Sequence, residues 1–458
     1  MANTKKKLIL IGAGGRGKGY TDLTKELSDE FELVAVAEPI DNRRNYIKET
    51  HGIPEELCFT TWEPLLAMPR MADVAVICTM DRDHFAPAMA AIEKGYHLLL
   101  EKPAAPTPEE CRAIQRAAEE KGVFVLICHV LRYTKFFRTL KDVIESGEIG
   151  EVMNIQHLEC VGNTHQSHSF VRGNWGNSER SSFMLLQKSC HDMDILAWLI
   201  GKKCTRVQSF GSLKHFTREN APAGSPERCI EGCPHADTCP YNAVKLYYDD
   251  KKNGWFRRAA TMENFPTDEQ VEKALWETQY GKCVYKCDND VVDHQVVNLE
   301  FEGGVTVSFT MSAFNRGGRF IRIMGTKGEL TASMRSPIIE IFNFETRRTR
   351  EIDLNAKVDE SIVGGHGGGD TGIILALRDL MDGKTDRSVC GIRESCDNHM
   401  IAFAAEESRR LGTVVNMEEF NARYGGCVAF HIPSIQATKS RGGAFSSSPE
   451  FYVYPSTI

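Results

Sequence analysis

A glycine-rich turn near the start of the chain could bind a phosphate. The apolar run at 8–11 ends in Gly12-Ala13-Gly14-Gly15-Arg16-Gly17, a G-x-G-x-x-G pattern between an expected strand and an expected helix. In this pattern the first glycine permits a tight turn, the second lets backbone N–H groups reach a pyrophosphate, and the third lets the helix lie close to the strand. A second apolar run ends in Glu38, where a ribose 2′-hydroxyl requires an acceptor. These features predict a dinucleotide site formed by Gly12, Gly14, Gly15, Arg16, Gly17 and Glu38.

A lysine and a polar stripe could carry proton transfer. Lys102 follows the apolar run 97–100, at the expected carboxyl end of a parallel strand, where ligands bind in such sheets. The segment 183–201 reads as one helix, and its polar face by i+3 and i+4 spacing holds Gln187, Lys188, His191 and Asp194. Lysine, histidine and carboxylate groups are common general acids and bases, so Lys102, His191 and Asp194 are the catalytic candidates. The alternatives are a solvated lysine after a strand and a core histidine that bonds to backbone.

The elements that must position these residues change in type along the chain. From residue 7 to about 129, strand-like runs alternate with helix-like segments, which implies a parallel sheet with crossover helices. One helix has a clear start, because Thr107 can cap it and Pro108 lies in its first turn. From Val152 onward, longer alternating runs with glycine turns at 303–304 and 325–328 predict antiparallel strands. We expect an α/β dinucleotide-binding domain at 1–129 and an α+β domain with an open, mostly antiparallel sheet at 130–424.

The composition is that of a large globular protein. The chain has 458 residues, more than one core usually supports, of which 42% are hydrophobic and 26% charged. A net charge of −7 gives no basic surface for nucleic acid, and no apolar run approaches the roughly 20 residues that span a bilayer. The first residues lead directly into a strand rather than forming a signal peptide, so we expect a cytoplasmic protein. The segment 425–458 is rich in Ser and Gly without periodicity, and we expect it to be a flexible tail.

Cysteines are concentrated in an expected insertion at about 225–290. The surrounding sequence is turn-rich and has little core of its own, so a structural zinc held by four thiolates could supply its folding free energy. The favoured ligands are Cys229, Cys233, Cys239 and Cys283, with Cys287 or His235 as substitutes. Free thiols and an iron–sulfur cluster are the alternatives.

Several motifs, taken in order, resemble those of the Gfo/Idh/MocA oxidoreductases. They are GAGGRG at 12–17, TMDRDH at 79–84, GYH at 95–97, EKP at 101–103, GEIGEV at 147–152, CHDMD at 190–194 and GHGGGD at 365–370. The resemblance covers about residues 5–420. It implies an α/β Rossmann domain joined to an open-faced sheet domain, with NAD or NADP between them and a sugar, inositol or related polyol as substrate.

The resemblance also implies roles for single residues. Lys102 would assist the oxidation of a secondary hydroxyl, and His191 would exchange the substrate proton. The chain departs from the family at Gln187, where similar proteins carry an Asp, so Asp194 or Lys102 would contribute more to the proton transfer. Further cofactor contacts are expected from Thr79, His84, Glu101 and Lys102. Substrate contacts are expected from Gln187, Lys188, Trp175, His294 and His366, although Trp175 could instead fill core and the loop at 366–370 could instead cap a helix through Asp370.

We expect an NAD-dependent oxidoreductase that takes a hydride from a secondary hydroxyl of a sugar, sugar derivative or polyol. Glu38 would repel a 2′-phosphate and so favours NAD over NADP, although Arg43 and Arg44 lie close. The alternative is an NAD-dependent glycosidase that uses transient oxidation at C3, elimination, hydration and re-reduction, since Gly-Gly-Arg-Gly is similar to such relatives. A third hypothesis is a nucleotide-binding sensor without catalysis. The open sheet predicts pairing with another copy in a homo-oligomer.

Overall fold

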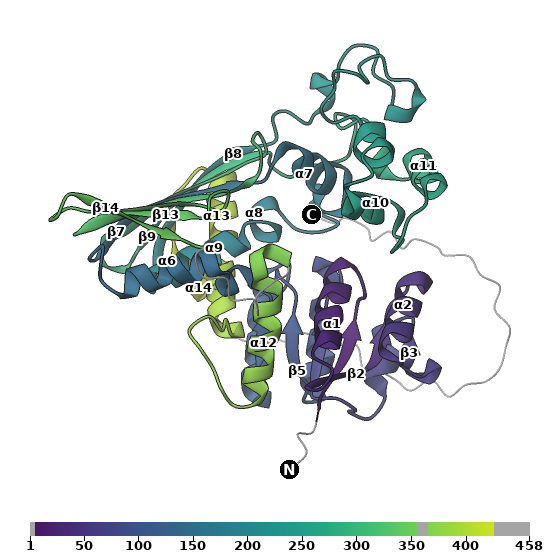
Figure 1. Cartoon of the computed structure of the whole chain (residues 1–458), viewed down its shortest axis with the longest axis horizontal. Coiled ribbons are helices and arrows are strands. Elements are labelled where there is room, and N and C mark those ends of the chain that lie inside the picture. The colour runs from purple at the N-terminus through teal and green to yellow at the C-terminus, as the bar shows by residue number, and fades with distance from the viewer. Residues whose placement is uncertain (1–4, 356–364, 426–458) are drawn as a thin grey trace. The chain divides into compact units, whose positions relative to one another are not determined.

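Two sheets carry the architecture of residues 5–355 and 365–425, which are the residues that the computed structural model describes (Figure 1). The first sheet is parallel and has the order β3-β2-β1-β4-β5-β6, the strand order of a Rossmann fold. Its four central strands are almost wholly buried, because helices cover both faces. The strands are β1 (Lys6–Ile11), β2 (Phe31–Ala37), β3 (Cys58–Phe59), β4 (Val74–Ile77), β5 (His97–Leu100) and β6 (Val125–Ile127).

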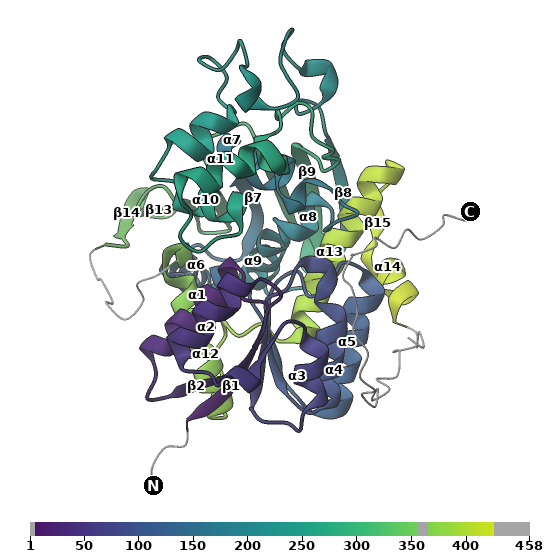
Figure 2. The same ribbon diagram turned by 90° about the vertical axis from the view of Figure 1, so that its right-hand side faces the viewer.

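Helices lie on both faces of the first sheet (Figure 2). One face carries α1 (Gly15–Glu26), α2 (Asp41–His51) and, from much later in the chain, α12 (Gly369–Met381); the other carries α3 (Trp62–Ala67), α4 (Phe85–Glu93) and α5 (Pro108–Lys121). Ile373 and Leu377 of α12 share a buried cluster with Leu8 and Leu10 of β1. The predicted cap of α5 is confirmed, since the Glu110 N–H donates to Thr107 Oγ1 at 3.2 Å.

The second sheet is mostly antiparallel, with the order β14-β13-β12-β11-β7-β10-β9-β8-β15. Its one parallel pair is β7 with β10, and the predicted hairpins β9–β10 and β11–β12 are confirmed. The sequence-based fold class is therefore confirmed. The strands are β7 (Val152–Cys160), β8 (Cys204–Ser212), β9 (His294–Phe301), β10 (Val305–Ser312), β11 (Gly318–Gly325), β12 (Gly328–Ser333), β13 (Ile338–Asn343), β14 (Arg348–Asp353) and β15 (Val415–Asn416).

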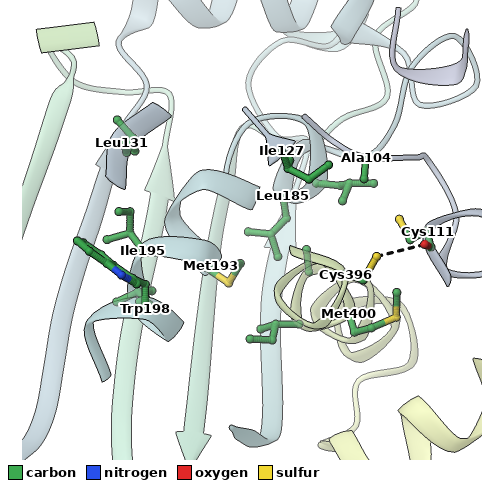
Figure 3. Packing of buried hydrophobic residues seen from close by; sticks show 14 of the residues in the cluster. Ala104, Cys111, Ile127, Leu131, Leu185, Met193, Ile195, Trp198, Cys396 and Met400 are labelled. Carbon is green, nitrogen blue, oxygen red and sulfur yellow. Dashed lines mark hydrogen bonds between the residues drawn. The ribbon is translucent and has the colours of Figure 1, made fainter. Parts of the chain in front are cut away.

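Helices beside the second sheet connect it to the first sheet through a continuous apolar cluster. These helices are α6 (Lys135–Glu145), α8 (Met184–Gln187), α9 (Cys190–Ile200), α13 (Ile392–Leu411) and α14 (Met417–Tyr424), whereas α7 (Asn163–Ser167), which follows β7, contributes no residue to this cluster. Figure 3 shows Ile127 of β6 close to Leu185 of α8, with Met400 of α13 in the same cluster. The Cys396 thiol of α13 donates to the Cys111 carbonyl of α5 at 3.1 Å (Figure 3). Elements that carry the candidate site are thus held by one core.

The insertion lies between β8 and β9 and contains α10 (Gly254–Thr261) and α11 (Asp268–Glu277). We expected little core here, but Tyr247, Phe256, Val271 and Leu275 form a small buried cluster of their own. Thr267 caps α11 by accepting from the Gln270 N–H at 3.3 Å. The insertion therefore has a packed core of its own, to which Cys229 contributes as a buried residue.

One predicted element is wrong. The segment 183–201 is not one helix, because α8 ends at Gln187 and α9 begins at Cys190, with Lys188 and Ser189 between them. The expected polar face therefore does not form, and its members point to different partners.

The predicted tail at 425–458 lies outside the described residues, apart from Gly425. The side chain of His366, a predicted substrate contact, also lies outside them. Among the described helices, none is both long and apolar enough to cross a membrane.

Candidate functional site

The glycine-rich loop is packed tightly on its inner side and is open on its outer side. Gly12 has φ +90°, and a Cβ there would lie 2.6 Å from the Cys78 carbonyl oxygen. A Cβ on Gly17 would lie 2.1 Å from the Gly12 oxygen, so both positions require glycine. A Cβ on Gly14 would meet nothing closer than Arg43 Nη1 at 3.9 Å, and one on Gly15 would meet nothing. The open side is the one from which a pyrophosphate can approach backbone N–H groups at the start of α1.

Glu38, predicted as a ribose contact, lies at the end of β2 next to the glycine-rich loop. Its buried carboxylate accepts the Ala13 N–H at 2.6 Å and the Ile40 N–H at 2.9 Å, which fixes it directly beneath the glycine loop. Each carboxylate oxygen keeps a second lone pair that a ribose hydroxyl can use. The residues present therefore fit the adenosine half of a dinucleotide.

Arg16 belongs to an ion-pair cluster. Its guanidinium donates to Glu101 Oε1 at 2.8 Å and to Asp370 Oδ1 at 2.7 Å, and it also bonds to the hydroxyl of Tyr20. Burial alone would raise the pKa of Glu101, but the charges of Arg16 and Lys102 lower it below the usual range. Arg16 thus links the glycine loop to the end of β5 and to the first turn of α12. This pairing accounts for the arginine that suggested a glycosidase, and it gives Asp370 a role other than capping α12.

The expected cofactor contacts after β4 hold two loops together. His84 is buried, with Nδ1 2.7 Å from the Pro103 oxygen and Nε2 3.2 Å from the Thr79 oxygen. Thr79 donates from its hydroxyl to the Asp83 oxygen at 2.9 Å. The loops that follow β4 and β5 are therefore fixed to each other at the carboxyl edge of the sheet, where Rossmann folds bind their ligands.

Lys102 connects the two sheets' elements at this edge. Its backbone N–H donates to Glu101 Oε2 at 2.9 Å, and its ammonium donates to the Gln187 carbonyl oxygen, at the end of α8, at 2.7 Å. The Gln187 amide is buried; it donates to the Trp175 carbonyl at 2.7 Å and bonds to the Ser181 hydroxyl at 3.0 Å. The backbone carbonyl of Gln187 therefore holds the Lys102 ammonium, and the side-chain amide of Gln187 holds the loop 175–181.

His191 lies in a group of histidines. Its ring is edge-on to His129 at 5.9 Å, and His129 is edge-on to His399 at 5.6 Å. Burial, together with the charges of Arg132 and Lys102, lowers the pKa of His129 to about 4, although Asp194 opposes the shift. The neighbours of His191 are therefore neutral rings at physiological pH.

Asp194 is buried beneath this group. Both of its oxygens accept from the Arg132 guanidinium at 2.7 Å, Oδ1 also accepts from Asn398 at 2.9 Å, and Oδ2 lies 3.8 Å from His129 Nδ1. Burial alone would raise the pKa of Asp194, but Arg132 and His129 keep it lowered. Oδ2 is too far from His129 Nδ1 for a hydrogen bond, so the carboxylate acts on His129 only through its charge, while Arg132 and Asn398 hold it in place.

A buried charge network beside His191 was not predicted. Arg319 of β11 pairs with Asp192 of α9 at 2.7 Å and with Glu159 of β7 at 2.7 Å. His157 Nε2 lies 2.8 Å from Asp192 Oδ1, and Lys188 pairs with Glu159 at 3.3 Å. The alternation of β7 could have shown that His157 and Glu159 face one side of the sheet. Lys188, predicted as a substrate contact, is the least buried member of this network.

His165 of α7 is a second residue that sequence reasoning missed. Burial and then the charges of Lys188, His168, Arg319 and Lys102 lower its pKa well below the usual value. The ring is edge-on to Trp255 of α10 at 5.4 Å. The side chain of Trp255 is 43% exposed. A neutral His165 and an exposed tryptophan ring therefore lie side by side, in the electrostatic surroundings of Lys188 and Lys102.

Trp175 and His294, two further predicted substrate contacts, lie in different parts of the structure. Trp175 donates from its indole N–H to Asp81 Oδ1 at 3.2 Å and packs on the main core, which places it next to Gln187. His294 Nδ1 lies 2.7 Å from Asp293 Oδ1, and the other oxygen of Asp293 accepts backbone N–H groups of Lys214 and His215. His294 thus belongs to a loop-holding group rather than to the cluster around Lys102.

The four cysteines predicted as zinc ligands line one small pocket. Cys229, Cys233, Cys239 and Cys283 surround it together with His235 and Arg172. Arg172 is buried, its Nη2 lies 3.9 Å from Cys229 Sγ, and its Nη1 has no hydrogen-bond partner.

The sulfur atoms are not arranged as zinc would hold them. Zinc bound at about 2.3 Å to each thiolate would bring the sulfurs to about 3.8 Å from one another. Among the described residues, the one group of three metal-ligating atoms within 4.8 Å of one another is His129, Asp194 and Cys390. Arg132 already occupies both oxygens of Asp194, so that group offers an ion no free carboxylate.

The chain matches two family models. Residues 6–129 match the model described as "Oxidoreductase family, NAD-binding Rossmann fold", and residues 141–417 match "Oxidoreductase family, C-terminal alpha/beta domain". Together the two matches cover most of the chain.

Individual relatives agree with the family models. The protein YteT of Bacillus subtilis (strain 168) is 26% identical over 404 residues, which are 83% of this chain and 89% of the relative. Inositol 2-dehydrogenase 4 of Saccharopolyspora erythraea is 27% identical over 227 residues, 49% of this chain and 62% of the relative. An Agrobacterium radiobacter oxidoreductase solved with NAD+, L-tartaric acid and magnesium has the same fold, with a TM-score of 0.63 and 15% identity over 91% of this chain and 99% of that chain. The chain therefore belongs to the Gfo/Idh/MocA family of oxidoreductases.

Proposed function

We propose that this protein uses NAD to oxidise a secondary hydroxyl of a sugar, sugar derivative or polyol. The observation that carries the proposal is the position of Lys102. Its backbone lies at the carboxyl edge of the Rossmann sheet, and its ammonium donates to the Gln187 carbonyl oxygen. This cation therefore lies between the loop that follows β5 and the end of α8, the helix before the one that carries His191. Inositol dehydrogenases among the relatives support a polyol as the substrate.

The proposed chemistry uses three groups of this chain. A bound nicotinamide would supply the hydride acceptor. Lys102 binds the substrate oxygen and stabilises the charge that develops on it as the O–H bond breaks. His191 accepts the hydroxyl proton, while Lys188 binds a neighbouring hydroxyl. Asp194 does not touch the substrate; it is held by Arg132 and Asn398 beneath the histidine group.

The proposal is tested by following NADH absorbance while the protein is incubated with NAD and a panel of inositols, aldoses, aldonates and alditols. We expect NADH to accumulate with at least one of them, in proportion to the amount of protein. Absence of NADH across the whole panel, from protein shown to bind NADH, would overturn the proposed activity.

We propose that Glu38 makes NAD the cofactor in preference to NADP. Replacing Glu38 with serine is expected to lower the ratio of the NADPH to the NADH dissociation constant by about tenfold, since like charges about 4 Å apart repel by about 1 to 4 kcal/mol. Arg43, whose Nη1 lies near Gly14, would then attract the 2′-phosphate. Titration of protein fluorescence with each cofactor measures the ratio. Glu32→Ser, on the same strand but exposed, is the control and should leave the ratio unchanged.

We also propose that the cysteine pocket holds a structural zinc once its side chains rotate inward. The buried charge of Arg172, with an unpartnered Nη1, would offset part of the charge of four thiolates. Elemental analysis should find about one zinc per chain, lost in a Cys229→Ser variant and kept in Cys160→Ser, which lies outside the pocket. Zinc-free protein with all four thiols open to titration would contradict this proposal.

A further inference from the structure

The insertion returns to the first sheet at one point, the start of α2. After α10 the chain passes through Glu263 and Asn264, which meet Asn42. The Asn42 amide donates to Glu263 Oε2 at 2.6 Å, and the Asn264 amide donates to the Asn42 carbonyl at 3.4 Å. The ring of Phe265 lies 6.4 Å from that of Tyr46 on the same helix. Four consecutive residues of the insertion, 262–265, thus contact the N-terminal turns of α2; we name this segment the clasp.

The clasp stands at the adenosine end of the dinucleotide groove. In a Rossmann fold the pyrophosphate binds at the glycine loop and the adenosine ribose binds at the acid that ends β2, here Glu38. Asn42 is the second residue of α2 and lies four residues after Glu38, and Arg43 beside it reaches to 3.9 Å from the position of a Cβ on Gly14. The clasp therefore faces α2 where the adenosine half would lie along it.

The helix before the clasp begins on the substrate side. Trp255, the second residue of α10, is edge-on to His165, whose pKa is lowered by burial and by Lys188 and Lys102. With eight residues and a rise of 1.5 Å each, α10 is about 12 Å long. In both views α10 lies above α1 and α2 (Figures 1 and 2). One short helix thus connects the neighbourhood of the catalytic lysine to the adenosine end.

We propose that the clasp forms the outer wall of an adenosine subsite, so that the dinucleotide is enclosed between the Rossmann domain and the insertion and leaves only when the clasp opens. The inference rests on the NAD binding proposed above. It assigns to the insertion a ligand-binding role, with the adenosine diphosphate half of the cofactor as its ligand. Because Glu263 brings a second carboxylate to the side of the ribose, the same wall also disfavours a 2′-phosphate.

The test is the rate at which NADH leaves the protein. Protein loaded with NADH is mixed with excess NAD in a stopped-flow instrument, and the loss of NADH fluorescence gives the dissociation rate constant. Glu263→Ala removes one hydrogen bond to Asn42 and is expected to raise that rate about fivefold; Glu263→Ala with Asn264→Ala is expected to raise it about twenty-fivefold. Glu272→Ala, which removes an exposed carboxylate from α11 of the same insertion, should leave the rate unchanged.

A second measurement locates the effect. Release of ADP-ribose should quicken in the clasp variants by the same factor as release of NADH, whereas release of reduced nicotinamide mononucleotide should not change. Thermal unfolding of each ligand-free variant shows whether it remains folded. Folded clasp variants that release NADH at the wild-type rate would overturn the inference while leaving NAD binding intact. Failure of the wild-type protein to bind NADH would instead overturn the proposed function on which it rests.

Discussion

Replacing Lys102 with alanine is expected to lower kcat for NADH formation by about 10² to 10⁴-fold, the range typical of a lost group that handles a proton or its developing charge. The ammonium bonds to the Gln187 carbonyl on the substrate side, so its loss removes the cation that binds the reacting oxygen. NADH affinity is expected to change by less than about threefold, because the glycine loop and Glu38 keep their bonds. Steady-state kinetics with the substrate identified from the panel, and NADH titration, measure the two effects.

Two further lysine variants make this result specific. Lys102→Arg keeps the positive charge but not the compact ammonium, and it should restore less than about a tenth of the rate, because the two side chains differ in geometry. Lys121→Ala at the exposed end of α5 should behave as the wild-type protein. A Lys102→Ala enzyme with more than half of the wild-type kcat would remove Lys102 from the reaction.

Replacing Arg132 with methionine is expected to lower the free energy of unfolding by about 3 to 5 kcal/mol, the cost of leaving a buried charge without its partner. Arg132 is wholly buried and is the cation that binds both oxygens of Asp194. Without it, the Asp194 carboxylate would remain beneath His129 with Asn398 as its main donor. Urea-induced unfolding followed by circular dichroism measures the change.

A double variant separates the buried charge from the packing. Arg132→Met combined with Asp194→Leu removes the buried carboxylate as well, leaves only the half-exposed Glu394 without this partner, and should recover a large part of the loss. Arg393→Met, which removes an exposed arginine paired with Glu119 on the surface, should cost less than about 1 kcal/mol. If Arg132→Met were no more destabilising than Arg393→Met, Asp194 could not be an anion that depends on this buried ion pair.

The nucleotide-binding half of the fold could be predicted because its signals are local. Gly12 needs a positive φ, Gly17 needs close packing, and Glu38 follows its strand directly, so each requirement is visible within a few residues. The cap at Thr107 and the two hairpins of the second sheet are local in the same way.

The candidate site was predicted less completely because its partners are distant in sequence. Arg16 pairs with Asp370, which lies 354 residues later, and Arg132 pairs with Asp194, 62 residues later. No periodicity indicates such pairs. Helical spacing applies only within an unbroken helix. Because the helix is interrupted at Lys188 and Ser189, the residues of the predicted polar stripe contact different partners. His165 was missed because the shift of its pKa depends on charges that are distant in sequence, among them those of Lys188 between α8 and α9, Arg319 of β11 and Lys102 after β5.

The central claim is that this protein transfers a hydride from a carbinol carbon to NAD, and isotopic labelling tests it most directly. A polyol that produces NADH is prepared with deuterium on the carbon to be oxidised, and the nicotinamide is analysed by mass spectrometry and proton NMR. The account predicts one deuterium at C4 of each reduced nicotinamide that the wild-type protein forms, and at least about 10²-fold less labelled cofactor in the same time with Lys102→Ala. Reduced cofactor that carries no deuterium, or equal amounts of labelled cofactor from both proteins in that time, would contradict it.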